Sequence, residues 1–194
     1  MTKQAVRNNI RYNENLVNQY LNTLNNLRKK VNDRNSQINQ YNSQISQLRS
    51  KIKGLKSQID ELNQLKSKYQ KLQNDFAGRQ TKRVNRFNLN FSKKTNLRFV
   101  LSYINGMRSL LSGNEYKRAY NGLSSAVNTI SSKIRAIQQE IDDLNKSINS
   151  KSNRIDLLRR EISSCQVQIN RTNSNLSYRR QRIAYWKNQL RYAI

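Results

Sequence analysis

The chain has 194 residues, with 37 lysines and arginines against 11 aspartates and glutamates, which gives a net charge of +26. It contains no histidine, no proline and a single cysteine, so the common zinc sites and the Ser-His-Asp and Cys-His triads are excluded. Only 35% of the residues are hydrophobic, against about 45–50% in a typical globular domain. The apolar side chains can therefore fill a narrow seam but not a thick core.

Residues 1–76 form the first predicted element, a long amphipathic helix. One heptad frame holds without a stutter, over many more heptads than a coiled coil needs, and most of its a and d positions are hydrophobic, although the last two a positions are the polar Lys66 and Gln73. The hydrophobic a positions are Ile10, Val17, Leu24, Val31, Ile38, Ile45, Ile52 and Ile59. The d positions are Asn13, Tyr20, Leu27, Arg34, Tyr41, Leu48, Leu55, Leu62, Tyr69 and Phe76. This pattern predicts a first coiled-coil arm.

Residues 77–115 interrupt the heptad frame and are rich in basic and aromatic side chains. The first part, residues 77–96, is predicted to be non-helical or frayed. Apolar residues at helical spacing then predict a short helix from Leu97 to Leu111. Leu111 and Gly113 mark the turn that ends it, because glycine is the usual residue just past a helix C-terminus.

Residues 116–194 form the second predicted arm, with its own unbroken heptad frame. Its a positions are Val127, Ile134, Ile141, Ile148, Ile155, Ile162, Ile169, Leu176, Ile183 and Leu190. Its d positions include Leu123, Ile130, Ile137, Leu144, Lys151, Leu158, Cys165, Thr172, Arg179 and Trp186. The absence of proline lets both helices run long.

The two arms are of equal length, which favours one antiparallel coiled-coil hairpin within an all-α fold. In such a hairpin, a residues of one arm face d residues of the other, and their residue numbers add up to a constant. Placing Phe76 opposite Tyr120 sets that constant at 196 and puts Ile45 beside Lys151, with no two seam charges in contact. A parallel homodimer, or a bundle with other chains, is the alternative that the same seams allow.

No residue pattern indicates catalysis, so the chain is predicted to be non-enzymatic, with no cofactor, metal or small-molecule substrate. The paired acids Asp60 and Glu61 point about 100° apart on a helix and cannot flank one bond. Cys165 occupies a d position, where a structural thiol is expected. None of the five glycines falls in a phosphate-binding loop motif.

Positive charge gathers in two parts of the sequence. One part holds Arg79, Lys82, Arg83, Arg86, Lys93, Lys94 and Arg98, with no acid between Asp75 and Glu115. The other follows Glu161, the last acid of the chain, and includes Arg179, Arg180 and Arg182. Both groups are candidate partner-binding sites, because a polycation attracts acidic proteins, nucleic acids and anionic lipids alike.

The aromatic residues within these segments allow two interpretations. Phe87 and Phe91 lie among the first group of cations and could stack on nucleic-acid bases. Alternatively, Phe87, Phe91 and Phe99 fold inward and close the hairpin. Tyr185 and Tyr192 near the C-terminus are equally open to both readings, whereas the seam position of Trp186 favours packing.

Three segments carry a family resemblance: LKSKYQKLQNDFAGRQTKR, YINGMRSLLSGNEYKRAYNGLSSAVNTISSKI and IQQEIDDLNKSI. Over about residues 37–150, the chain resembles the small helical-hairpin proteins of the WXG/LXG class that are linked to bacterial type VII secretion. These proteins share two long amphipathic helices and a turn marked by a bulky residue, any residue and a glycine, here Leu111 to Gly113. The resemblance implies a non-enzymatic accessory or targeting partner that lies alongside the helical domain of an effector.

The sequence therefore predicts a coiled-coil structural or adaptor protein that binds an acidic protein partner through helix packing and its basic ends. A nucleic-acid-binding structural protein, associated with a genome or a ribosome, is one alternative, and an oligomeric structural assembly is another. No signal-peptide core and no run of about 18 apolar residues is present. We accordingly expect no transmembrane segment, and a protein that is cytoplasmic or exported without a classical signal peptide.

Overall fold

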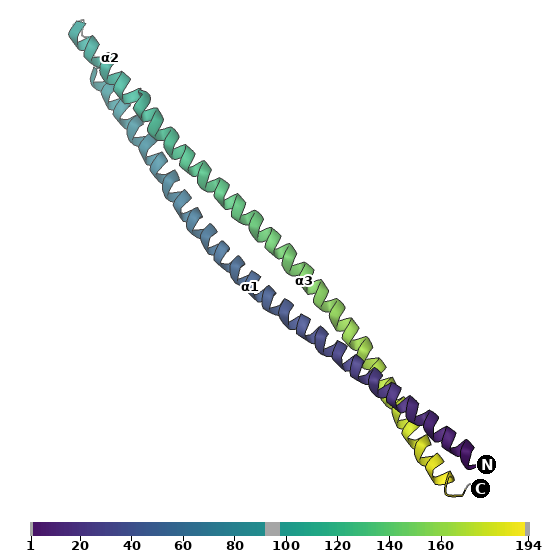
Figure 1. Ribbon diagram of the computed structural model, residues 1–194. Coiled ribbons are helices and arrows are strands. Elements are labelled where there is room, and N and C mark those ends of the chain that lie inside the picture. The colour runs from purple at the N-terminus through teal and green to yellow at the C-terminus, as the bar shows by residue number, and fades with distance from the viewer. Residues whose placement is uncertain (1, 92–97, 193–194) are drawn as a thin grey trace. The chain divides into compact units, whose positions relative to one another are not determined.

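In a computed structural model, the chain forms three α-helices: α1 (Lys3–Phe91), α2 (Arg98–Ser112) and α3 (Asn114–Gln189). The structure describes residues 2–91 and 98–192, without the side chains at 88–91, 108 and 110–112. This part of the chain contains no β-strand and no cis peptide bond. The predicted all-α helical hairpin is confirmed, with α1 and α3 packed against each other in opposite directions (Figure 1).

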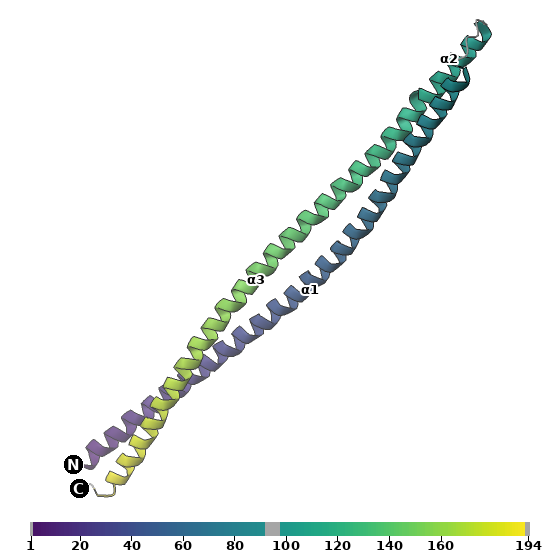
Figure 2. The same cartoon turned by 180° about the vertical axis from the view of Figure 1, so that it is seen from behind.

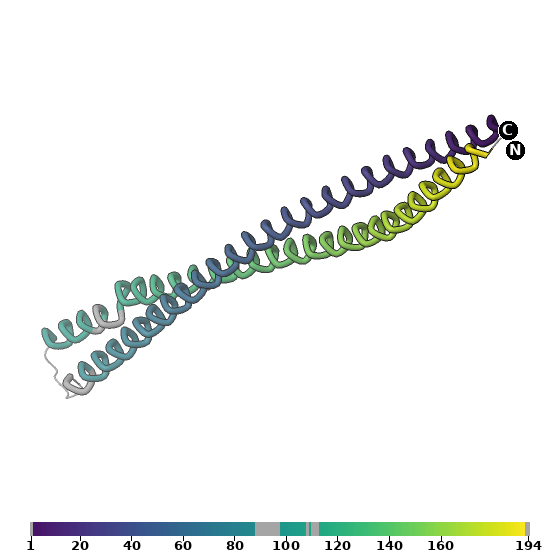
Figure 3. The backbone as a smooth tube through the Cα atoms, turned by 90° about the horizontal axis from the view of Figure 1, so that it is seen from below, coloured from purple at the N-terminus to yellow at the C-terminus, as the bar shows by residue number. Residues whose placement is uncertain are grey.

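The helices divide into two compact units, each of which takes part of both arms. Unit 1 comprises residues 1–48 and 146–194, and unit 2 comprises residues 49–145. In unit 1, the first part of α1 lies beside the last part of α3, with the two chain termini at the same end in both views (Figures 1 and 2). In unit 2, the later part of α1 runs alongside the early part of α3 (Figure 3).

The seam between the helices follows the predicted heptads. Every a and d position from Ile10 to Phe76, and from Tyr120 to Leu190, is buried or half-buried. Leu158 is completely inaccessible to solvent. In unit 1, a cluster of buried leucines and isoleucines is extended by half-buried neighbours, among them Val31 and Cys165. Because a two-helix layer has a single interior face, these seam side chains supply most of the apolar burial that stabilises the helices.

Contacts across the seam agree with the predicted register. The Lys151 ammonium, expected beside Ile45, donates a hydrogen bond to Oε1 of the adjacent Gln44 at 2.8 Å in unit 1. In unit 2, Nε2 of Gln73 donates to the Ser124 hydroxyl at 2.6 Å. The residue numbers of these pairs add up to 195 and 197, on either side of the expected 196. In each unit, α1 therefore meets α3 in the expected frame at these positions.

Polar residues on the seam have their hydrogen-bonding groups satisfied. Asn13 is buried, and its side-chain amide donates to the Asn9 carbonyl at 2.7 Å while accepting from the Arg179 guanidinium at 3.3 Å. Arg34 pairs with Glu161 on the opposite helix. Among the described residues, no buried side-chain nitrogen or oxygen lacks a partner. An unpaired buried polar group would cost about 1–3 kcal/mol, so these bonds let polar residues occupy the seam.

The prediction that residues 77–96 are non-helical or frayed is wrong for residues 77–91, which continue α1. Beyond Phe76, the inward-facing residues become Gln80, Val84 and Phe87. Two consecutive four-residue steps, from 76 to 80 and from 80 to 84, shift the seam around the helix without breaking it. Loss of the heptad frame thus marks a change of register rather than a helix end.

The short helix predicted between Leu97 and Leu111 is confirmed as α2, one residue later at each end. Among the described side chains of α2, Ile104 is buried, and Val100 and Met107 are half-buried on the same face. A bend at Gly113 separates α2 from α3, as predicted. The glycine carbonyl already accepts the first α3 hydrogen bond, from Lys117 N–H at 3.3 Å, and no described glycine has a positive φ.

Candidate polyanion-binding surfaces

The two ends of the chain bring many basic residues to the same end of unit 1 (Figure 1). Because α1 and α3 run in opposite directions, the first turns of α1 lie beside the last turns of α3 (Figure 1). These helical turns, together with the turn that follows α3, hold eight cations, here called the terminal cluster: Lys3, Arg7, Arg11, Arg179, Arg180, Arg182, Lys187 and Arg191. All three predicted residues of the C-terminal group, Arg179, Arg180 and Arg182, belong to it.

Almost no negative charge balances this cluster. The chain has no acid before Glu14 and none after Glu161. Glu14 approaches the Lys187 ammonium at 3.7 Å, and both side chains are largely exposed. Such an exposed pair contributes about 0–1 kcal/mol and neutralises one of the eight cations. The remaining positive charges create a local field that favours an anionic partner.

Two arginines of the terminal cluster stack on aromatic rings. The Arg179 guanidinium lies 5.2 Å from the ring centre of Tyr178. The Arg182 guanidinium lies 5.1 Å from the ring centres of both Tyr185 and Trp186. These two rings meet edge to face, with centres 5.0 Å apart. Stacking restricts the flexible arginine side chains, so less conformational entropy is lost when they bind an anion.

A second basic surface, the tip cluster, lies on the last turns of α1 in unit 2. Arg79, Lys82, Arg83 and Arg86 are all exposed. The other three cations follow Arg79 by three, four and seven residues, which places all four on one side of the helix. None of the four forms an ion pair within the described residues.

The other predicted members of the tip cluster are only partly placed. Lys93 and Lys94 lie outside the described residues, and Arg98 is exposed at the first position of α2. Leu111, a residue of the predicted turn, lies within α2, and its side chain is not among those that the structure describes.

The phenylalanines near the tip cluster do not behave alike. Phe87 is buried on the inward side of α1, in agreement with a packing role. Phe99, on α2, is 81% exposed, so the expectation that it folds inward is wrong. Leu101 on the same helix is also exposed. The Phe91 side chain lies outside the description. Helix α2 thus buries one face and leaves apolar side chains on another.

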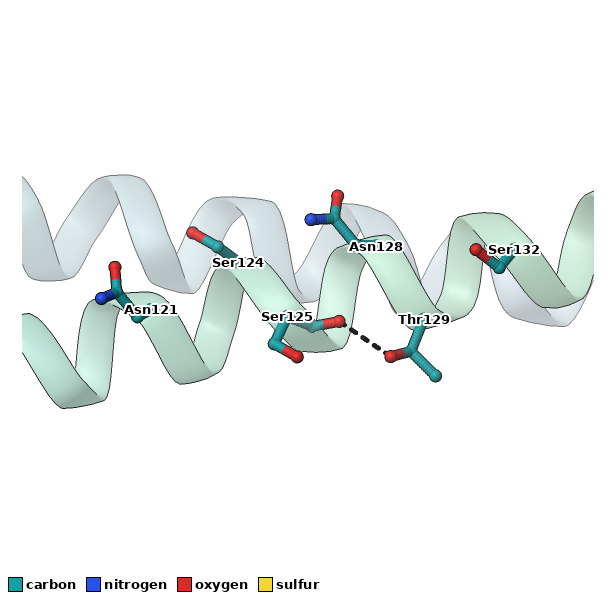
Figure 4. A pocket seen from close by; sticks show the side chains of 6 residues that line it. All are labelled: Asn121, Ser124, Ser125, Asn128, Thr129 and Ser132. Carbon is teal, nitrogen blue, oxygen red and sulfur yellow. Dashed lines mark hydrogen bonds between the residues drawn. The ribbon is translucent and has the colours of Figure 1, made fainter.

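An open depression on the surface of unit 2 is lined by small polar side chains of α3 (Figure 4). The six lining residues are Asn121, Ser124, Ser125, Asn128, Thr129 and Ser132. The Thr129 hydroxyl donates to the Ser125 carbonyl at 2.9 Å, and the Ser124 hydroxyl donates to the Tyr120 carbonyl at 3.2 Å. All six lining side chains carry hydroxyl or amide groups, so the lining itself supplies no general acid or base.

Sequence reasoning missed the α1 half of the terminal cluster. Lys3, Arg7 and Arg11 are scattered among asparagines and do not stand out as a charge run. The register constant of 196 could have identified these residues, because it places Arg7 opposite Gln189 and Arg11 opposite Tyr185. Both partners lie in the cationic C-terminal segment. Charge therefore has to be counted across the hairpin rather than along the chain.

No described helix has a stretch that is both long and hydrophobic enough to cross a lipid bilayer. Within residues 2–91 and 98–192, no three potential metal-ligating side chains cluster together. A comparison of the chain with protein families, with curated proteins and with solved structures gave no match.

Proposed function

We propose that the chain is a non-enzymatic coiled-coil adaptor or structural protein that holds a negatively charged macromolecule on its basic surfaces. The terminal cluster carries this proposal, since it joins eight cations from both ends of the chain around a single acid. The seam side chains are occupied by the partner helix, so a ligand has to meet the outer faces. Those faces offer positive charge, hydrogen-bond donors and exposed tyrosines.

Such a surface acts mainly by accelerating association. A positive field steers an anionic partner during diffusion and raises the association rate, and this effect falls as salt screens the charges. Self-association is disfavoured, because two copies that each carry a net charge of +26 repel one another. A partner of opposite charge is therefore favoured over a homo-oligomer.

The experiment compares two variants with equal charge loss in unit 1. The terminal variant replaces Arg7, Arg11, Arg180 and Arg191 by glutamine, and all four are exposed. The control variant replaces Arg28, Lys29, Lys30 and Arg154, which are equally exposed but lie away from the chain ends. Fluorescence anisotropy measures binding to labelled polyglutamate and to a labelled oligonucleotide at low salt.

We expect the terminal variant to lose at least tenfold in affinity for one of these polyanions, and the control variant to lose clearly less. Equal losses would show that the affinity depends only on net charge and would refute the terminal cluster as a defined binding surface. A matching set of glutamines at Arg79, Lys82, Arg83 and Arg86 measures the contribution of the tip cluster in the same assay.

The WXG/LXG resemblance supplies a more specific version of this role, an accessory protein that accompanies an exported effector. The helical hairpin supports it. Its test is the distribution of the native protein between cells and medium, with and without an active type VII secretion system. Retention in the cytoplasm under both conditions would restrict the proposal to an intracellular adaptor.

A further inference from the structure

The last turns of α3 expose a row of aromatic rings. Tyr178, Tyr185 and Tyr192 are 53%, 48% and 76% exposed and recur at every seventh residue. Tyr178 and Tyr185 lie within α3, where seven residues correspond to two helical turns, so these two positions lie on one side of the helix, about 10 Å apart along its axis. Tyr192 lies in the turn that follows the end of α3 at Gln189. We call this set the tyrosine row. Arg171 precedes it by a further seven residues and is also exposed.

The surroundings of the tyrosine row are positive or neutral. The Arg179 and Arg182 guanidinium groups lie over Tyr178 and Tyr185 respectively. Neighbouring outward positions on α3 are serine, asparagine and glutamine, and α3 contains no acid after Glu161. A ligand on this face therefore meets aromatic rings, guanidinium groups and amides together.

We propose that the partner held on the terminal cluster is a single-stranded nucleic acid, whose bases stack on the tyrosine row while Arg171 and Arg182 contact its phosphates. This inference rests on the proposed function and names its partner. Proteins that bind single strands combine a positive track for the backbone with aromatic side chains for the bases. The guanidinium group matches phosphate geometry better than an ammonium group does.

Two other polyanions fit the face less well. Between residues 168 and 192, tyrosines are the only exposed large hydrophobic side chains, whereas a helix that binds membranes needs a broad apolar face of leucine or phenylalanine. An acidic protein would pair with the arginines but would not require the exposed tyrosine rings as contacts. Duplex DNA hides the faces of its bases inside the stack, so the rings could not reach them.

The test measures the affinity of the full-length protein for a labelled oligo(dT) single strand, with substitutions in the tyrosine row. A Tyr178→Leu/Tyr185→Leu variant removes both rings without altering charge, and leucine favours helix formation, so folding should be retained. We expect an affinity loss of about tenfold or more for each ring, because stacking of one base on one ring accounts for roughly this change. The matched Tyr178→Phe/Tyr185→Phe variant keeps the rings and should bind like the parent protein.

Salt dependence separates stacking from phosphate contacts. The plot of log affinity against log salt should keep its slope in the leucine variant, because its phosphate contacts are unchanged. In an Arg171→Gln/Arg182→Gln variant the slope should become shallower by about one to two, since each phosphate contact releases counterions. Parent-like oligo(dT) binding by the leucine variant would overturn the stacking proposal.

Parallel titrations with a matched duplex, with polyglutamate and with anionic lipid vesicles decide between the partner classes. Single-strand binding at least tenfold tighter than all three supports the proposal. If another polyanion binds as tightly or more tightly, the tyrosine-row proposal fails while the proposed adaptor function stands. If no polyanion binds even at low salt, both fail.

Discussion

Burial on this fold is decided by position rather than by residue type. Leu157 and Leu158 are adjacent and chemically identical, yet Leu158 is fully buried and Leu157 is 47% exposed. Leu158 occupies a d position of the α3 seam, whereas Leu157 occupies the neighbouring c position. Comparing substitutions at these two positions therefore measures how much burial on the seam contributes to the free energy of unfolding at a single residue.

We expect Leu158→Ala to lower the free energy of unfolding by about 2–4 kcal/mol, because it removes buried methyl groups and leaves a cavity. Leu157→Ala should change it by about 0.5 kcal/mol or less, since this residue is exposed at a position away from the seam. Urea denaturation followed by circular dichroism measures both values. Similar losses for the two variants would contradict the assigned seam.

At the scale of whole elements, much of the fold can be predicted from the sequence. The heptad frames place the seam of both arms and set their register, because apolar spacing directly reports which side of a helix is buried. The same logic fails at residues 77–91. The heptad pattern expects a three-residue step after Gln80, so the four-residue step to Val84 is mistaken for the end of the helix. Helix continuation requires only helical residues and one buried side, which this segment retains up to Phe87.

The binding surface is less accessible to sequence reasoning. The C-terminal arginines stand out as a charge run, but Arg7 and Arg11 join them only through the antiparallel pairing. The stacking of Arg182 between Tyr185 and Trp186 depends on side-chain conformations that residue spacing does not specify. Charge patterning thus leads to the proposal of a polyanionic partner, whereas packing determines which cations lie near one another on the helices.

Gly54 provides a test of helix α1 as an element. It lies on an exposed side of the helix, and a β-carbon built there would meet no atom within 4 Å. Gly54→Ala should therefore raise the free energy of unfolding by about 0.5–1 kcal/mol, because alanine restricts the unfolded chain and favours the helix. Thermal unfolding at matched salt measures the shift, and a destabilised variant would contradict the open environment of this position.

For the whole molecule, net charge opposes folding. A thin seam holds together a chain of charge +26, and compaction brings its cations closer. Added salt screens this repulsion, with a Debye length that falls from about 30 Å at 0.01 M to about 10 Å at 0.1 M. We expect the melting temperature to rise over this range, as followed by circular dichroism.

The charge-reduced control variant should show a smaller rise, because it carries four fewer cations in unit 1. A melting temperature that falls with salt would mean that attractive ion pairs, such as Arg34 with Glu161, outweigh the repulsion.

The hairpin itself can be tested through the single native cysteine. Val31 and Cys165 border the same buried cluster, and their residue numbers add up to the register constant of 196. A Val31→Cys variant should therefore place two thiols across the seam of one molecule, where a short thiol cross-linker joins them. Asp33→Cys, on the exposed side of α1, is the matched control and should remain unlinked.

Mass spectrometry should identify the peptides containing residues 31 and 165 in a cross-linked product of monomer mass. The parallel-homodimer alternative makes a different prediction, because its seams pair the same arm of two chains. The introduced thiol at position 31 would then link to the same position of a second molecule and double the mass. A monomeric product linked between residues 31 and 165 requires the chain to fold back on itself in the proposed register, since no other pairing brings these two thiols within reach inside one molecule.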